Sequence, residues 1–161
     1  MSGVNMKCDL NVPDLFKEQE SLLIEAICGY GGFDEKSRKR IHRLFDGESV
    51  LFDVVVDLCK CCEFELFLQP NGGAREVVPL TEFGAAIKSV RKTFAAELSQ
   101  EAFAAANYFN KRTLIKCEKL NADCSTSIRI ANLVEYLSIF DYRFGIQRVK
   151  SNLKIWATFT Q

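Results

Sequence analysis

The sequence has one histidine, no net charge and no long apolar run. The scarcity of histidine and of long apolar runs argues against two classes of function. The histidine, His42, lies in a run of basic residues typical of a solvated helix face, so we expect no histidine-based catalytic triad. The most apolar run, residues 50–58, carries two aspartates and is too short to cross a bilayer. The first fourteen residues are polar and lack an apolar core, so we expect no secretory signal.

Motifs for nucleotides and metals are also missing. There is no G-x-x-x-x-G-K-[ST] phosphate loop, and the glycine-rich segment at residues 29–32 is followed by two acidic residues that would repel a phosphate. Residues 59–62 contain a C-x-x-C pair, but zinc needs a second pair. Cys117 and Cys124 are separated by six residues, not the two to four of a zinc site. We therefore expect no catalytic residues, no metal and no cofactor.

Seven cysteines in irregular spacing indicate reduced thiols rather than a disulfide framework. Free cysteine is among the most buried residue types, so residues 59–62 are interpreted as part of a buried helix. We expect a cytoplasmic or nuclear protein with no membrane partner. A small metal- or thiol-dependent protein stays open as a third interpretation of function.

The composition predicts a single globular domain over residues 1–161, with 48% hydrophobic and 26% charged residues. Its charge is unevenly distributed. Residues 1–70 hold eight basic and thirteen acidic residues, and residues 71–161 hold thirteen and eight. The two halves could pack together, copies could associate head to tail, or the basic half could bind a polyanion.

Apolar periodicity predicts mostly helices. One helix follows Asp14, a second begins at Asp34, and residues 48–62 form a third candidate for which a strand is the alternative. Further helices begin at Thr81, at Ser99 and near residues 125–127, the last of them ended by Gly145. Residues 146–159 fit either a helix or a strand.

The clear β signal is near residues 63–80. Apolar and acidic residues alternate over residues 63–69, and the turn chemistry of Pro70-Asn71-Gly72-Gly73 follows. Together these patterns predict a mainly α, single-domain helical bundle of five to seven helices with one short β-hairpin.

Basic residues recur at helical spacing in the second half of the chain, interleaved with the aromatic residues Tyr108, Phe109, Tyr142 and Trp156. This pattern suits phosphate contact combined with base stacking. The expected nucleic-acid-binding residues are Lys88, Arg91, Lys92, Lys111, Arg112, Lys116, Lys119, Arg148 and Lys150.

We therefore predict a non-enzymatic, self-associating protein that binds RNA or DNA with little sequence specificity, in a viral nucleocapsid- or suppressor-type role. The alternative is a helical protein–protein adaptor whose basic face meets an acidic protein surface, with no nucleic acid involved.

Two stretches resemble the coat proteins of rod-shaped plant viruses. Residues 23–28 through 43–45 are similar to the first helix pair of that family, and residues 109–112 to the start of its RNA-contacting helix. The resemblance implies an assembly of helical subunits on RNA. Residues 48–62 would be an extra element, and the Arg/Asp-rich helix start of the family is missing before Ile128, so we do not assign the chain to it.

Overall fold

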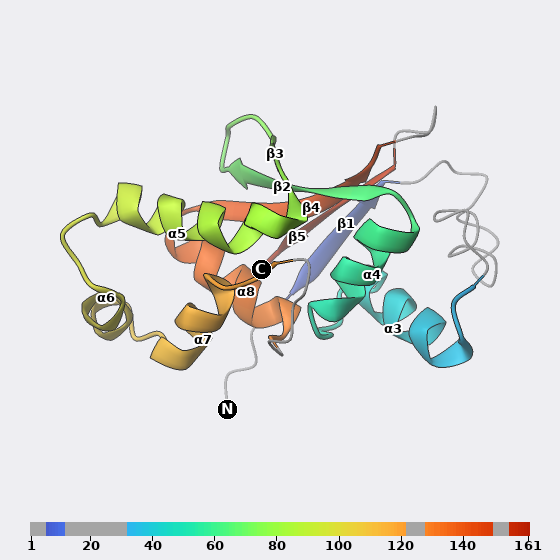
Figure 1. Cartoon of the computed structure of the whole chain (residues 1–161), viewed down its shortest axis with the longest axis horizontal. Helices are drawn as coiled ribbons and strands as arrows, with labels where there is room; N and C mark the ends of the chain where they lie inside the picture. The colour runs from blue at the N-terminus through green and yellow to red at the C-terminus, as the bar shows by residue number, and fades with distance from the viewer. Residues whose placement is uncertain (1–5, 12–31, 122–127, 150–154) are drawn as a thin grey trace.

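An antiparallel sheet of five strands organises the structure, a computed structural model that describes residues 6–11, 32–121, 128–149 and 155–161 (Figure 1). The strand order is β1-β5-β4-β2-β3. The strands are β1 (Lys7–Asn11), β2 (Phe64–Pro70), β3 (Glu76–Val78), β4 (Tyr142–Arg148) and β5 (Trp156–Thr160). In the centre of the sheet β2 pairs with β4 from Phe64↔Arg148 to Pro70↔Tyr142.

This sheet makes the fold α/β, and the prediction of a mainly helical bundle is wrong. The expected hairpin is present, because β2 pairs with β3 across the turn at residues 71–75. It is, however, one edge of a larger sheet, with β4 on the other side of β2. Residues 146–159 take the strand alternative where the structure describes them, in the end of β4 and the start of β5.

Helices lie at both ends of the long axis of the molecule, and α8 lies between them (Figure 1). Figure 1 shows α3 and α4 at one end and α6 and α7 at the other. The elements are α3 (Glu35–Phe45), α4 (Asp53–Cys61), the short 3-10 helix η2 (Leu80–Glu82), α5 (Phe83–Phe94), α6 (Gln100–Ala106), α7 (Lys111–Cys117) and α8 (Ile130–Ile139). No helix within the described ranges has the length and apolar character needed to cross a membrane.

Two predicted helix starts are confirmed by their caps. The side chain of Asp34 accepts a hydrogen bond from the Ser37 N–H at 2.7 Å, and that of Ser99 accepts one from the Ala102 N–H at 3.1 Å. The helix expected after Asp14 lies outside the described residues. The segment after Ser99 is two helices, α6 and α7, rather than one.

Gly145 does not end a helix, as its sequence position suggested. It lies in the middle of β4, where a Cβ atom would fall on the carbonyl oxygen of Ala157 and on the ring of Phe67. Glycine is therefore required here by a close approach between a ring and the sheet backbone. The residue that follows α8 with positive φ is Asp141.

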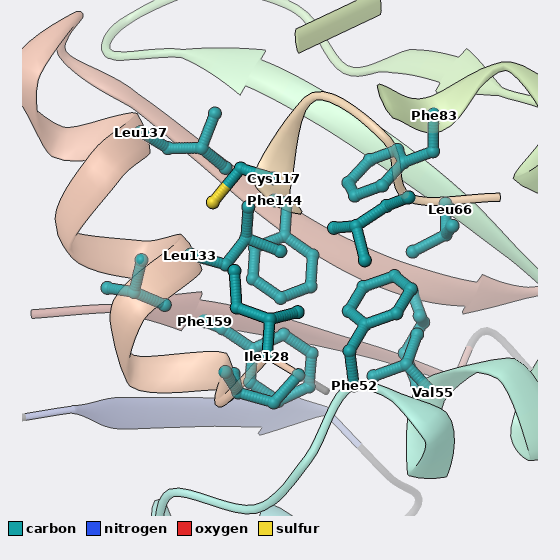
Figure 2. Close-up of a cluster of buried hydrophobic side chains, with 14 of the residues drawn as sticks. Phe52, Val55, Leu66, Phe83, Cys117, Ile128, Leu133, Leu137, Phe144 and Phe159 are labelled. Atoms are coloured by element: carbon teal, nitrogen blue, oxygen red, sulfur yellow. The ribbon is translucent and has the colours of Figure 1, made fainter. Parts of the chain in front are cut away.

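The hydrophobic core fills the space between the helices and one face of the sheet (Figure 2). Phe52 stacks on Phe83 with ring centroids 5.7 Å apart, and both rings contact that of Phe144 on β4. The core-facing strand residues are Phe64, Leu66, Leu68, Phe144, Ile146, Ala157 and Phe159. The opposite face of the sheet carries polar and aromatic side chains instead.

Candidate nucleic-acid interface

The structure places six of the nine expected binding residues on exposed helical surface. Lys150 lies outside the described residues, and Arg148 is half-buried at the end of β4. The exposed six are Lys88 and Lys92 on α5, Lys111, Arg112 and Lys116 on α7, and Lys119 just after α7. Their positions are compatible with contact to a polyanion.

Arg91 was expected to bind nucleic acid, and that prediction is wrong because the residue is buried. Its side chain is 2% exposed and forms a two-pronged ion pair with Glu118, from Nε to Oε2 at 2.7 Å and from Nη2 to Oε1 at 3.0 Å. A buried charge has to be paired because leaving it alone would cost several kcal/mol. Arg91 therefore has a structural role, joining α5 to the end of α7.

Glu118 is the centre of this buried network. It also accepts hydrogen bonds from the hydroxyl of Tyr136 at 2.6 Å and from Nε2 of Gln100 at 3.1 Å. Burial alone would raise the pKa of Glu118, but the hydrogen bonds from Arg91, Tyr136 and Gln100 lower it overall. Burial, together with the hydrogen bond to Glu118, raises the pKa of Tyr136. The network fixes α5, α6, α7 and α8 relative to one another.

A close backbone contact joins the two lysine-rich helices. Gly84, in the first turn of α5, donates its N–H to the Leu120 carbonyl at 2.8 Å. A Cβ atom at Gly84 would lie 2.6 Å from the Leu120 nitrogen and 2.7 Å from the Glu118 oxygen. Lys119 is thus held beside the start of α5, and Lys88 follows Gly84 by one helical turn. The basic residues of α5 and those of α7 and its end are therefore neighbours at this junction.

The charge around this junction is strongly positive. Residues 83–120 hold seven basic and three acidic residues, and the buried Arg91–Glu118 pair neutralises one of each. Lys111 is within 3.6 Å of Glu101 on α6, in an exposed pair that stabilises the fold little. The basic side chains of α7 therefore face solvent with an excess of positive charge.

Tyr108 is the most exposed large hydrophobic residue of the described ranges, at 98%. It follows α6 in the left-handed conformation, with φ of 53°. The Tyr108 N–H bonds the Ala105 carbonyl at 3.4 Å and the Phe109 N–H bonds the Ala104 carbonyl at 2.9 Å. This is a Schellman helix end, whose left-handed position glycine prefers. A tyrosine there costs about 1 kcal/mol relative to glycine and buries no surface in return.

The other aromatic residues that interleave with the basic ones are less accessible. Phe109 stacks on Tyr136, with ring centroids 5.0 Å apart, and is half-buried. Tyr142 is half-buried as well, and Trp156 lies on the polar face of the sheet. Sequence reasoning noted Tyr108 only as a neighbour of basic residues. Its position just after an alanine-rich helix, where glycine would be expected, could have identified Tyr108 as a candidate binding residue from the sequence.

We define the α5–α7 surface as Tyr108 with the six exposed basic residues Lys88, Lys92, Lys111, Arg112, Lys116 and Lys119. Tyr108 precedes Lys111 by only three residues, so its ring and the first basic side chains of α7 lie at one corner of the molecule. Such a corner offers a stacking platform beside several phosphate contacts.

Several thiols in the described part of the chain are poorly suited to chemistry at neutral pH. Burial raises the pKa of Cys59 to about 12, and burial also raises the pKa of Cys61 and Cys117. A thiol with a raised pKa is a weak nucleophile because little of it is ionised. Within the ranges that the structure describes, no group of three or more His, Cys, Asp or Glu residues could hold a metal ion.

A groove of about 720 Å³ lies between α5 and the β2–β3 hairpin. Its walls are mainly apolar, with Val78 on one side and Val90 on the other, and Phe94 at its edge is 59% exposed. Exposed apolar surface of this kind is typical of protein-binding sites.

Comparisons of the chain with models of protein families, with curated proteins and with solved structures found no match.

Proposed function

We propose that the chain binds single-stranded RNA or DNA with little sequence preference, through the α5–α7 surface. Basic side chains at helical spacing would contact phosphates, and the ring of Tyr108 would stack on a base. The proposal includes no catalytic step. The expected activity is binding alone, in a packaging or sequestering role.

One observation carries the proposal: a fully exposed tyrosine occupies a left-handed position where glycine would be more stable. The position is needed to end α6, but the tyrosine ring contributes nothing to the fold. A ring held away from the molecule, three residues before Lys111 and four before Arg112, is accounted for by a ligand that stacks on it and carries negative charge.

The test is the salt dependence of oligonucleotide binding. We expect a fluorescein-labelled oligothymidylate to bind the full chain at low salt, with affinity falling linearly against the logarithm of salt concentration. Each phosphate contact on a single strand contributes a slope of about −0.7. The double variant Arg112→Ala/Lys116→Ala should therefore bind more weakly and shallow the slope by roughly one to two units.

A matched control removes the same charge elsewhere. Lys36 and Lys39 are exposed on α3, at the opposite end of the long axis from α7 (Figure 1). The variant Lys36→Ala/Lys39→Ala should bind like the unmodified chain. Equal weakening by both double variants would show a diffuse charge effect rather than a site, and no binding at low salt would refute the proposal.

The second candidate function, an adaptor that binds protein and not nucleic acid, is favoured by the groove between α5 and the hairpin. In that case Phe94 and the groove would be the contact surface and the oligonucleotide would not bind. The variant Phe94→Ser separates the two functions: it should leave oligonucleotide affinity unchanged if the α5–α7 surface is the functional site.

Self-association stays a prediction from the charge asymmetry. On α3 and α4 several charges are already paired within the chain, as in Arg40–Asp53 and Arg43–Glu48. These pairs leave other described acids of this half, such as Asp9, Asp46 and Asp57, outside an ion pair, so acidic surface is still present for a second copy. Sedimentation velocity at low and at high salt measures the association directly, and a monomer under both conditions would remove it.

A further inference from the structure

The polar face of the sheet carries a layered cluster around Arg75. The ring of Phe67 on β2 lies against Gly145 of β4, and the guanidinium carbon of Arg75 is 4.6 Å from the centre of that ring. The same guanidinium is 4.6 Å from the ring centre of Trp156 on β5. A cation close to two aromatic rings is held in a defined place although its residue is exposed.

A second arginine lies on the same face. Arg143 projects from β4 and donates from Nε to Oε1 of Gln69 at 3.2 Å, and Gln69 in turn donates to the Gly73 carbonyl at 2.9 Å. Burial lowers the pKa of Arg75, and the positive charge of Arg143 lowers it further, so the two guanidinium groups interact electrostatically. Two like charges placed near each other repel, which favours an anion between them.

Carboxylates do not neutralise this pair. Glu65, on the same face, accepts a hydrogen bond from Nε2 of Gln147 at 2.7 Å, and Arg75 reaches only the Oε1 of that glutamine, at 3.4 Å. Within the described residues, neither Arg75 nor Arg143 forms an ion pair with an acid. The side chains that contact one another here come from strands or from the β2–β3 turn, so no described helix covers the cluster.

We infer that this face of the sheet, around Arg75, Arg143 and Trp156, is a second contact site for single-stranded nucleic acid, with a backbone phosphate bound between the two guanidinium groups. The guanidinium fork matches phosphate oxygens in pairs, and the flat aromatic and guanidinium groups suit a neighbouring base. A nucleotide satisfies both features, whereas an acidic peptide satisfies only the charge. The inference rests on the proposed function and extends it to a surface of which the sequence pattern indicated Trp156 but not Arg75.

The single tryptophan of the chain makes this site directly observable. Trp156 contacts Arg75, so an anion that engages Arg75 should change the emission of the indole. We expect oligothymidylate to quench tryptophan emission of the full chain saturably, with the same midpoint as the anisotropy of the labelled oligonucleotide. Inorganic polyphosphate, which has no bases, should compete for binding but quench less.

Two variants define the contact. Arg143→Gln keeps a polar group beside Gln69 and removes the charge, and it should weaken binding roughly fivefold and shallow the salt slope by about 0.7. Arg75→Lys keeps the charge but loses the flat group over the rings, and it should reduce the quenching more than the affinity. Arg129→Gln is the matched control, since Arg129 is exposed at the start of α8, away from this face. Circular dichroism melts verify that each variant is folded.

The outcomes separate this site from the α5–α7 surface. Oligonucleotide binding with unchanged tryptophan emission and unchanged affinity of Arg143→Gln would overturn the inference and leave the proposed function standing. Quenching and oligonucleotide affinity that both depend on Arg143 but not on Arg112 and Lys116 would support the inference and refute the α5–α7 surface. No oligonucleotide binding at all would overturn both. Quenching by polyglutamate and not by oligothymidylate would assign the site to an acidic protein partner and overturn the inference.

Discussion

Arg91 and Glu118 meet in the interior of the protein through two hydrogen bonds, of 2.7 and 3.0 Å, with both side chains 2% exposed. Each residue comes from a segment whose other charged neighbours face solvent. The pair therefore divides the basic residues of α5 into two kinds, since Lys88 and Lys92 are available to a ligand and Arg91 is not.

Loss of Arg91 should destabilise the fold strongly. The variant Arg91→Met leaves the Glu118 carboxylate buried without its cation, which costs about 3–5 kcal/mol in the free energy of unfolding. Urea denaturation followed by circular dichroism measures the loss. The control Lys92→Met, an exposed residue next along α5, should change stability by no more than about 0.5 kcal/mol. Similar losses in both variants would contradict the buried pair.

The network also predicts a pH dependence of stability. The pKa of Glu118 is lowered in the folded state from its ordinary value of 4.5. Below that value the unfolded chain takes up a proton at this site before the folded chain does, so the free energy of unfolding falls as the pH is lowered. Its contribution is fully present above about pH 4.5 and is lost as the pH falls through the folded pKa.

The variant Glu118→Gln removes this titration and leaves the other carboxylates in place. It should be less stable at neutral pH, and its stability should decline less steeply on acidification than that of the unmodified chain. Urea unfolding at several pH values on either side of the ordinary pKa gives both slopes. If the free energy of unfolding declined with falling pH at the same rate in the variant and in the unmodified chain, Glu118 would not be held ionised by its partners.

Replacing Tyr108 with glycine should move stability and binding in opposite directions. Glycine adopts the left-handed conformation without strain, so Tyr108→Gly should raise the free energy of unfolding by about 1 kcal/mol. Loss of one stacked base should weaken oligonucleotide binding about fivefold or more. The conservative variant Tyr108→Phe keeps the ring and should bind normally. A glycine variant that is more stable and binds equally well would remove Tyr108 from the interface.

Gly145→Ala tests the sheet itself. Its Cβ would fall on the Ala157 carbonyl and the Phe67 ring, and this overpacking should cost at least about 2 kcal/mol. Gly72→Ala is the control, because no atom lies near its Cβ and only the positive φ of 74° opposes the substitution, at about 1 kcal/mol. If Gly145 instead ended a helix, the two substitutions would cost about the same.

The sequence predicted the local features well. Asp34 and Ser99 begin helices, residues 71–73 turn a hairpin, and apolar periodicity locates the helices at residues 35–45 and 130–139. These features depend on neighbours in the chain. Strands β1, β4 and β5 depend on pairing with distant segments, and their own patterns are weak. In β4 the residues Tyr142, Phe144 and Ile146 alternate with Arg143, Gly145 and Gln147, but Gly145 is also a residue typical of a helix end, and this favoured the helix interpretation.

The candidate site was predicted in part for the same reason. Spacing of three and four residues identified exposed lysines on α5 and α7, but it also included Arg91. That residue lies four positions after Ile87 and seven after Gly84, which places it on the buried side of α5. Its partner Glu118 comes from another helix, and no pattern within α5 reveals it. Trp156 was expected as a stacking residue, but its position beside Arg75 and on one face with Arg143 was not predictable, because three separate segments bring them together.

The pairing of β1 with β5 joins Lys7 to Thr160 and Asn11 to Trp156, so among the described strands β5 is the one sheet partner of β1. During synthesis β1 leaves the ribosome before β5, and it has no sheet partner until β5 emerges. The central strands can assemble before then, but closure of this edge must wait until residues 156–160 have been made. Pairing between segments so far apart in the sequence slows folding, because the chain loses the entropy of closing a long loop before the stabilising contacts form. A ribosome stalled before residue 156 would therefore present β1 as an unpaired strand, accessible to chaperones or to proteases.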